Sequence, residues 1–98
     1  MKTLNVHPSL LPAFPGAHAV RDALAYGARV TGATVHYVDE GTDTGPIILQ
    51  ESLPIEPGDT VESLHARIQI LEHRLVPQAV RLHQSGRIRV ADRKVTIA

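Results

Sequence analysis

The sequence predicts an α/β fold that contains a β-hairpin and one long amphipathic helix. Two segments rich in β-branched residues, 29–38 and 47–55, flank a short acidic turn, as the two strands of an antiparallel hairpin do. In the second half, apolar residues recur every three or four positions, the spacing of a helix with one buried face: Val61, Leu64, Ile68, Leu71 and Leu75. No linker divides residues 1–98, so we expect a single domain or a part of one.

The other predicted elements are shorter. Residues 3–7 alternate polar and apolar side chains and stop at Pro8, which indicates a short strand. The following stretch, up to Gly16, contains three prolines and predicts an ordered loop. Residues 17–26 favour a helix that ends at Gly27. Two short strands are expected at 87–90 and 94–97.

The ends of the long helix carry further signals. Asp59 or Thr60 can cap its first turn, and Glu62 is spaced for a capping box with Asp59. Pro77 lacks a backbone N–H, so we expect it to kink or restart the helix, which continues toward Gly86.

Composition excludes several classes of function. Ten basic residues balance ten acidic ones, so the chain lacks the positive charge of a general nucleic-acid binder. No apolar run reaches the length of a membrane span, and there is no signal-peptide pattern. The absence of cysteine excludes disulfides and thiol chemistry and fits a cytoplasmic protein. We therefore expect neither a nucleic acid nor a membrane as partner.

The first candidate for chemistry is the pair Asn5 and His7. Residues two apart on a strand share one face, and Pro8 ends the strand directly after them. An amide and an imidazole on one face offer a hydrogen-bond donor and a proton carrier to the same carbonyl oxygen. The alternative is an edge histidine beside a turn asparagine.

The second candidate is the acidic turn, in which Asp39, Glu40 and Asp43 fall within five residues. A carboxylate beside a histidine favours the protonated ring and fixes its orientation. A solvated hairpin turn is the alternative. A calcium loop is excluded, because Thr44 and Gln50 occupy the positions that need glycine and glutamate.

The remaining sequence patterns give weaker indications of function. Asp43-Thr44-Gly45 is the triplet of aspartic proteases, but a long helix follows, whereas the dimeric retroviral enzymes are almost wholly β. No HExxH pair appears, so we expect no metal. His36 could line the face that carries the turn. The remaining features are expected to be packed or solvated: His65 and His73 near the helix stripe, and the basic tail of Arg87, Arg89, Arg93 and Lys94.

With Asn5, His7 and Asp43 in view, the stretches NVHPSLLPAFPG and VTGATVHYVDEGTDTGPIILQ resemble the C-terminal half of the phosphoribosylglycinamide formyltransferase family. The resemblance runs through essentially the whole chain and implies the C-terminal half of a mostly parallel sheet fold. It also implies transfer of a formyl group from 10-formyltetrahydrofolate to glycinamide ribonucleotide in purine biosynthesis.

Carried over by position, the resemblance implies a catalytic trio of Asn5, His7 and Asp43. Asn5 would donate to the formyl oxygen, and His7, kept protonated by Asp43, would stabilise the oxyanion and help to protonate the leaving nitrogen. Asn5 and the turn residues Asp39, Glu40, Gly41, Thr42 and Asp43 would bind the folate. The substrate nucleotide would be bound by Gln69, Ile70, Leu71, Glu72, Pro8 and Gly16.

Two related families share the trio. Formyltetrahydrofolate deformylases have a second histidine where this chain has Pro8, and methionyl-tRNA formyltransferases differ over residues 15–19. Both differences favour the nucleotide enzyme.

The resemblance covers only half of a family member, because the nucleotide-binding parallel sheet precedes this part. Residues 1–98 are therefore expected to be one partial domain, the C-terminal catalytic half. Alone, the strand at residues 3–7 would lack neighbouring strands, and activity would require a complementary N-terminal half or a second copy. One alternative is a non-catalytic fragment that binds folate or only associates with itself. The other is a dimeric aspartic protease that uses the Asp43-Thr44-Gly45 triplet.

Overall fold

The centre of the molecule is a three-stranded antiparallel sheet in the order β1-β2-β3. The computed structural model describes residues 3–98. Its strands are β1 (Leu4–His7), β2 (Val30–Tyr37) and β3 (Ile47–Pro54). The helix α1 (Ala19–Tyr26) lies between β1 and β2, and α2 (Val61–Gln84) follows β3. A separate hairpin of β4 (Ile88–Ala91) and β5 (Lys94–Ile97) ends the chain.

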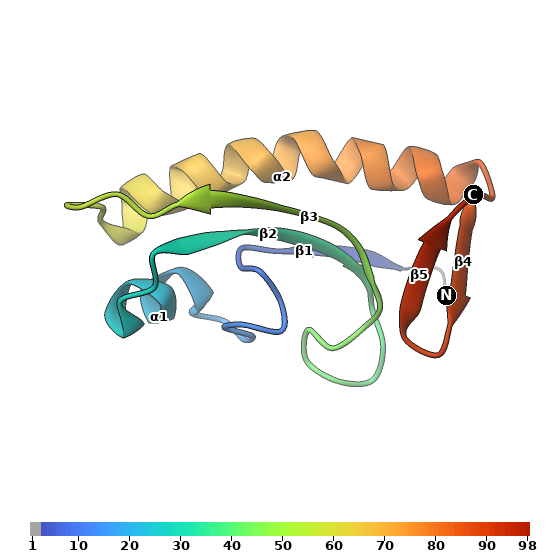
Figure 1. Cartoon of the computed structure of the whole chain (residues 1–98), viewed down its shortest axis with the longest axis horizontal. Helices are drawn as coiled ribbons and strands as arrows, with labels where there is room; N and C mark the ends of the chain where they lie inside the picture. The colour runs from blue at the N-terminus through green and yellow to red at the C-terminus, as the bar shows by residue number, and fades with distance from the viewer. Residues whose placement is uncertain (1–2) are drawn as a thin grey trace.

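The two faces of the sheet are covered by different parts of the chain. Figure 1 shows α2 running along one face. The helix α1 packs against α2, and the loop that precedes α1 covers the other face, where it bonds to Thr34 and Gln50. The central strand β2 is buried from Thr31 to Tyr37, because it has a neighbouring strand on each side and cover on both faces. The functional side chains identified below come from the face that the loop covers.

Register decides which side chains share a face. Leu4 pairs with Tyr37 and His7 with Thr34 across β1 and β2. Directly opposite residues of an antiparallel pair point to the same side of the sheet. Leu4 and Val6 pack against the core on the α2 side, so Asn5 and His7 point to the opposite side.

The core joins the buried stripe of α2 to the α2-facing residues of the sheet. Leu64 and Ile68 are completely buried, as the helical spacing predicts, whereas Val61 at the start of the stripe is exposed. The cluster contains Val20, Ala33, Val35, Tyr37, Ile48, Leu64, Ile68, Leu71, Leu75 and Ala79. Such burial of aliphatic area is the main favourable term for a chain with so few aromatic residues.

The cap of α2 differs from the predicted one in its partner residue. Thr60 is the N-cap: its hydroxyl accepts from the Ser63 N–H at 3.1 Å, and the Ser63 hydroxyl accepts from the Thr60 N–H at 2.9 Å. The predicted box between Asp59 and Glu62 is therefore wrong. Asp59 instead accepts hydrogen bonds from Arg67 and the Glu56 N–H, which stabilise the turn before the helix.

Pro77 does not restart the helix, since α2 is continuous from Val61 to Gln84. The missing N–H costs one hydrogen bond, and the buried residues on both sides of the proline, Leu75 and Ala79, keep the segment on the sheet. The helix of residues 17–26 begins two residues later than predicted and ends at Gly27, as expected, with φ of 86°.

The α/β class, the hairpin and the long helix are confirmed, and every pairing within residues 3–98 is antiparallel. The expectation that the first strand lacks neighbours is wrong, because β1 pairs with β2. Its other side is an edge of the sheet in the described part of the chain. No helix in residues 3–98 combines the length and the apolar content that crossing a membrane requires.

Candidate active site

Asn5 and His7 lie at the edge of the sheet, opposite His36 and Thr34 respectively. Asn5 is exposed. The loop after β1 covers His7, which keeps only 5% of its accessible surface. The strand thus presents an amide to solvent beside an imidazole that is already engaged with the protein.

Both ring nitrogens of His7 face an acceptor oxygen. Nδ1 lies 3.4 Å from Oδ2 of Asp43, and Nε2 lies 2.8 Å from the carbonyl oxygen of Phe14. A neutral imidazole carries one N–H and can donate to only one of these oxygens, whereas an imidazolium donates to both. The geometry brings residues 7 and 43 together, with an oxygen facing each nitrogen of the ring.

Asp43 receives contacts from three segments of the chain. Its Oδ2 accepts a hydrogen bond of 2.9 Å from the Gly16 N–H, in addition to facing His7. Its Oδ1 lies 3.7 Å from Nε2 of His36 on β2. The side chain keeps 13% of its surface, and its backbone has a φ of 56°. The carboxylate of Asp43 therefore lies between one backbone donor and two imidazole rings.

The contact between His36 and Asp43 was not predicted, although His36 was expected on this face. Its Nδ1 donates to its neighbour's carbonyl, that of Tyr37, at 2.9 Å. Its Nε2 is the one buried side-chain polar atom in residues 3–98 that makes no hydrogen bond. Because this nitrogen points at Asp43, the carboxylate lies between two histidines. The only sequence signal was the two-residue spacing from Thr34 to His36, which puts both on one face.

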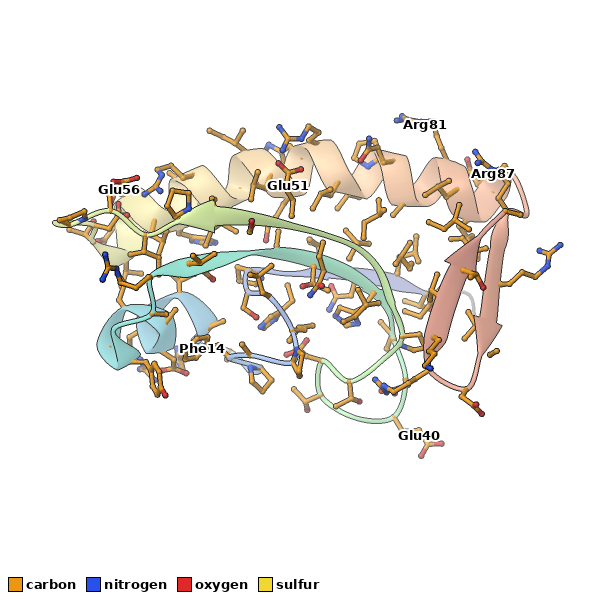
Figure 2. The ribbon with its side chains drawn as sticks, viewed as in Figure 1. Phe14, Glu40, Glu51, Glu56, Arg81 and Arg87 are labelled. Atoms are coloured by element: carbon orange, nitrogen blue, oxygen red, sulfur yellow. The ribbon has the colours of Figure 1, made fainter. Side chains whose placement is uncertain are left out.

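The residues predicted to bind folate form one turn between β2 and β3. Asp39 accepts from the Thr44 hydroxyl at 2.7 Å and from the Gly41 N–H at 2.9 Å, and these bonds hold the pKa of its carboxyl below the usual range. Glu40 lies at the outer end of this turn, as Figure 2 shows, and Thr42 is exposed.

Gly45 closes the turn against β2. A Cβ atom at this position would lie 1.6 Å from the carbonyl oxygen of Tyr37, which no side chain could tolerate. The Tyr37 N–H also donates to the carbonyl of Pro46 at 2.9 Å. The turn that carries Asp43 is thus tied to the strand that carries His36.

A buried threonine fixes the loop that covers His7. The Thr34 hydroxyl donates to the Ser9 carbonyl at 2.7 Å and accepts from the Leu11 N–H at 3.2 Å. Gln50 on β3 donates both to this hydroxyl and to the Leu11 carbonyl. Leu11 is buried, and the predicted ordered loop is confirmed. The sequence did not predict the polar network, because it joins three distant segments.

A cavity of about 390 Å³ opens beside Asp43. Loop residues and Ile47 form an apolar wall, the turn supplies polar groups, and Arg93 of the terminal hairpin closes one side. The full lining is Leu11, Pro12, Pro15, Thr42, Asp43, Thr44, Gly45, Ile47 and Arg93. An apolar wall with a few convergent polar groups is typical of a small-molecule site.

The predicted nucleotide-binding residues of α2 do not all have accessible side chains. Glu72 lines a hollow with Val6, and burial raises the pKa of its carboxyl. Gln69 and Ile70 are exposed, whereas Leu71 is a core residue, so only its main chain could contact a substrate. In the loop, Pro8 is half-buried, and Gly16 donates to Asp43. No group of three or more potential metal ligands occurs in residues 3–98.

Comparison with known proteins defines the class to which this site belongs. The sequence model of the family described as formyl transferase matches residues 1–80. The chain belongs to the formyl transferase family.

The names of individual relatives are more specific than the family description. The phosphoribosylglycinamide formyltransferase of Mycobacterium tuberculosis is 56% identical over 102 residues, covering 98% of this chain and 47% of that protein. The crystal structure of glycinamide ribonucleotide transformylase 1 from Symbiobacterium toebii has a TM-score of 0.95 at 55% identity, over 96% of this chain and 44% of its own. The crystal structure of a formyltetrahydrofolate deformylase from Pseudomonas syringae has a TM-score of 0.90 at 34% identity, and the match covers 96% of this chain and 32% of the deformylase chain. The chain thus spans about half the length of the curated formyltransferases that it matches.

Proposed function

We propose that this chain is the folate-binding and catalytic half of a phosphoribosylglycinamide formyltransferase. It would transfer a formyl group from 10-formyltetrahydrofolate, the co-substrate, to the amine of glycinamide ribonucleotide, in the cytoplasm. The observation that carries the proposal is the pairing of His7 with Asp43, on the same face as Asn5. Family membership and the higher identity to nucleotide enzymes than to the deformylase support the choice of acceptor.

The reaction needs no covalent enzyme intermediate. The amine of the nucleotide attacks the formyl carbon, a new C–N bond forms, and the carbonyl oxygen becomes an oxyanion. Cleavage of the bond between that carbon and N10 of the folate restores the carbonyl. N10 gains one proton and the attacking nitrogen loses one, so the products are the formylated nucleotide and tetrahydrofolate.

The trio has a role at each stage. The Asn5 amide would donate to the formyl oxygen, and the His7 imidazolium would stabilise the oxyanion. His7 would then protonate N10 and recover a proton from the former amine. Asp43 would keep the ring charged and oriented throughout, and the Gly16 N–H and His36 would hold Asp43 itself.

Access to His7 requires a movement of the loop. The Nε2 atom, on the side away from Asp43, donates to the Phe14 carbonyl, so a substrate oxygen can replace this contact only when the carbonyl moves away. Phe14 has a φ of 49°, a conformation that costs free energy for a residue other than glycine. We expect substrate binding to displace this carbonyl.

Recognition of the two substrates would use separate groups. The main chain and side chains of residues 39–43 would hold the pteridine beside Asn5. Gln69, Ile70, the Leu71 main chain and Glu72 would contact the ribose, and Pro8 and Gly16 would border the glycinamide.

Activity would require a complementary N-terminal half, which supplies the phosphate site. The comparisons support this requirement, because the chain covers 47% of the Mycobacterium tuberculosis relative. The open edge of β1 is the place where a further strand could pair. On this basis residues 1–98 form one partial domain.

The test is to reconstitute formyl transfer. The 98-residue chain is mixed with a separate chain that carries the first half of the Mycobacterium tuberculosis relative, and the formation of tetrahydrofolate and formylated nucleotide is measured. We expect transfer by the mixture and its loss in His7→Ala. His65→Ala, at an exposed histidine of α2, is the matched control and should retain transfer.

The second candidate is a fragment that binds folate without catalysis, which the occupied Nε2 of His7 favours. Calorimetric binding of 10-formyltetrahydrofolate, without transfer in the reconstituted mixture, would support this candidate and contradict the first.

A further inference from the structure

Arg93 is placed differently from the other basic residues of the C-terminal tail. It lies in the turn between β4 and β5, outside residues 1–80 that match the family. The sequence predicted a solvated side chain. The residue is exposed, as predicted, but its Nη2 also donates a hydrogen bond to the main-chain carbonyl of Thr44, 49 residues earlier in the sequence. Figure 1 shows the closed end of this hairpin beside the connection between β2 and β3.

The acceptor carbonyl is in the part of the turn that presents Asp43. Thr44 directly follows Asp43, and its hydroxyl donates to Asp39 at 2.7 Å, which closes the turn from inside. Arg93 holds the same residue from outside, through its carbonyl. The positive charge of Arg93 also acts on the Asp39 carboxylate. Arg93 and Asp43 line one cavity.

The hairpin can serve as a fixed support for this contact. Four residue pairs join its strands, from Ile88 with Ile97 to Ala91 with Lys94. The Arg87 guanidinium donates to the Ala98 carbonyl at 2.7 Å, and Ile88 packs against the core. The turn of residues 39–44 is otherwise mostly exposed, so a contact from a supported hairpin restricts it more than a contact from a free side chain would.

We propose that Arg93 is a positioning residue, which holds the turn of residues 39–45 in the conformation that brings Asp43 to His7. Its catalytic consequence rests on the proposed formyltransferase function. The physical contact does not, so the two can fail separately. Lysine at this position can still donate one hydrogen bond to the carbonyl, whereas alanine cannot.

The experiment uses amide NMR spectra and hydrogen exchange of the 98-residue chain with Arg93→Ala, Arg93→Lys and Arg89→Ala. Arg89 is the matched control, an exposed arginine of the same hairpin that donates to the Gly86 carbonyl. We expect Arg93→Ala to shift the amide signals of Gly41, Asp43 and Thr44 and to speed their exchange roughly 3–10-fold, the loss of about one hydrogen bond. Arg93→Lys should recover most of the difference, and Arg89→Ala should leave the turn unchanged.

A second measurement connects the turn to the ligand. In calorimetric titration with 10-formyltetrahydrofolate, Arg93→Ala should weaken binding roughly 3–10-fold, again with recovery in Arg93→Lys. Turn amides that do not respond to Arg93→Ala, or that respond equally to Arg89→Ala, would overturn the proposal. Altered turn amides in a chain that binds no folate would instead contradict the proposed function and leave the positioning contact in place.

Discussion

Asp43 is the residue on which the site converges. It contacts the loop through Gly16, β1 through His7 and β2 through His36. These partners are 27, 36 and 7 residues away in the sequence, so the fold alone brings them together. A carboxylate in this position can orient the His7 ring without itself taking part in proton transfer.

Replacing Asp43 by asparagine tests this role. The asparagine amide has no charge. If its N–H₂ group takes the position of Oδ2, it faces the Gly16 N–H and cannot accept a hydrogen bond from it. In the reconstituted enzyme, Asp43→Asn should lower the rate of formyl transfer at pH 7 by roughly 100-fold or more, because His7 would lose its charge partner. Single-turnover measurements with both substrates would show the loss, and a rate within about 3-fold of wild type would contradict the assigned role.

Gly45 provides a prediction about stability. Gly45→Ala places a methyl group 1.6 Å from the Tyr37 carbonyl oxygen, so the turn must move, at a cost of about 3 kcal/mol or more in unfolding free energy. Gly27→Ala is the comparison: it meets no atom within 4 Å and suffers only from its φ of 86°, about 1 kcal/mol. Urea unfolding measures both, and equal losses would contradict the steric argument.

At the scale of elements, the N-terminal end of α2 depends on charge as well as on capping. Asp59 accepts from Arg67 at 2.5 Å, from the Glu56 N–H at 2.7 Å and from the Ser63 hydroxyl at 2.8 Å. The Arg67 bond, with the other two, lowers the pKa of the Asp59 carboxyl to about 2. The group stabilises the turn between β3 and α2 only while it is ionised.

This shift predicts how stability depends on acid. Because the folded pKa of about 2 lies below the ordinary value of 3.8, the contribution of Asp59 is present above that ordinary value and is lost as the pH falls toward 2. Asp59→Asn should therefore show a shallower loss of unfolding free energy between about pH 4 and pH 2 than wild type. Urea midpoints at several pH values measure the slopes, with Asp22→Asn on α1 as control. Equal slopes in wild type and Asp59→Asn would contradict the prediction.

Much of this arrangement could be predicted from local patterns. Apolar spacing predicted α2, β-branched runs predicted β2 and β3, and Gly27 was predicted to end α1. The capping partner was wrong because Ser63 and Glu62 both fit a capping pattern, and Ser63 occupies the N3 position once Thr60 is the N-cap. Pro77 was wrongly predicted as a possible restart of the helix, because burial of flanking residues outweighs one missing hydrogen bond.

The site was harder to predict than the elements. Asn5 and His7 follow from strand periodicity, and their association with Asp43 came from family resemblance. The contacts of His36 with Asp43, of Thr34 with the loop and of Arg93 with Thr44 depend on tertiary register. No local pattern predicts them, because each joins groups whose spacing in sequence carries no periodic signal.

At the scale of the whole molecule, the open edge of β1 matters most. The sheet ends there in the described part of the chain, with Leu4 and Val6 only partly buried beside α2. An unpaired strand edge next to apolar side chains favours association with a further strand. Asn5 and His7 of the candidate site lie on this same strand, so under the proposed function completion of the sheet and activity would be linked.

The open edge of β1 leads to a prediction about assembly with a complementary chain. Adding the first half of the Mycobacterium tuberculosis relative should slow hydrogen exchange at those β1 amides that do not bond to β2, at least 10-fold, because they gain partners. Exchange at the β4–β5 hairpin should not change, and this hairpin is the internal control. Protection of β1 without the added chain, with a doubled mass in sedimentation, would show self-association instead.

The position of the ring proton of His7 tests the pairing of His7 with Asp43 most directly. Long-range ¹H–¹⁵N NMR correlations of the 98-residue chain at pH 7 report which ring nitrogens carry protons. We predict a proton on Nδ1 of His7, directed at the Asp43 carboxylate, in wild type, and its loss from Nδ1 in Asp43→Asn, where an amide N–H₂ can face the ring. A His7 ring that carries its proton on Nε2 alone in both proteins would contradict the pairing of His7 with Asp43.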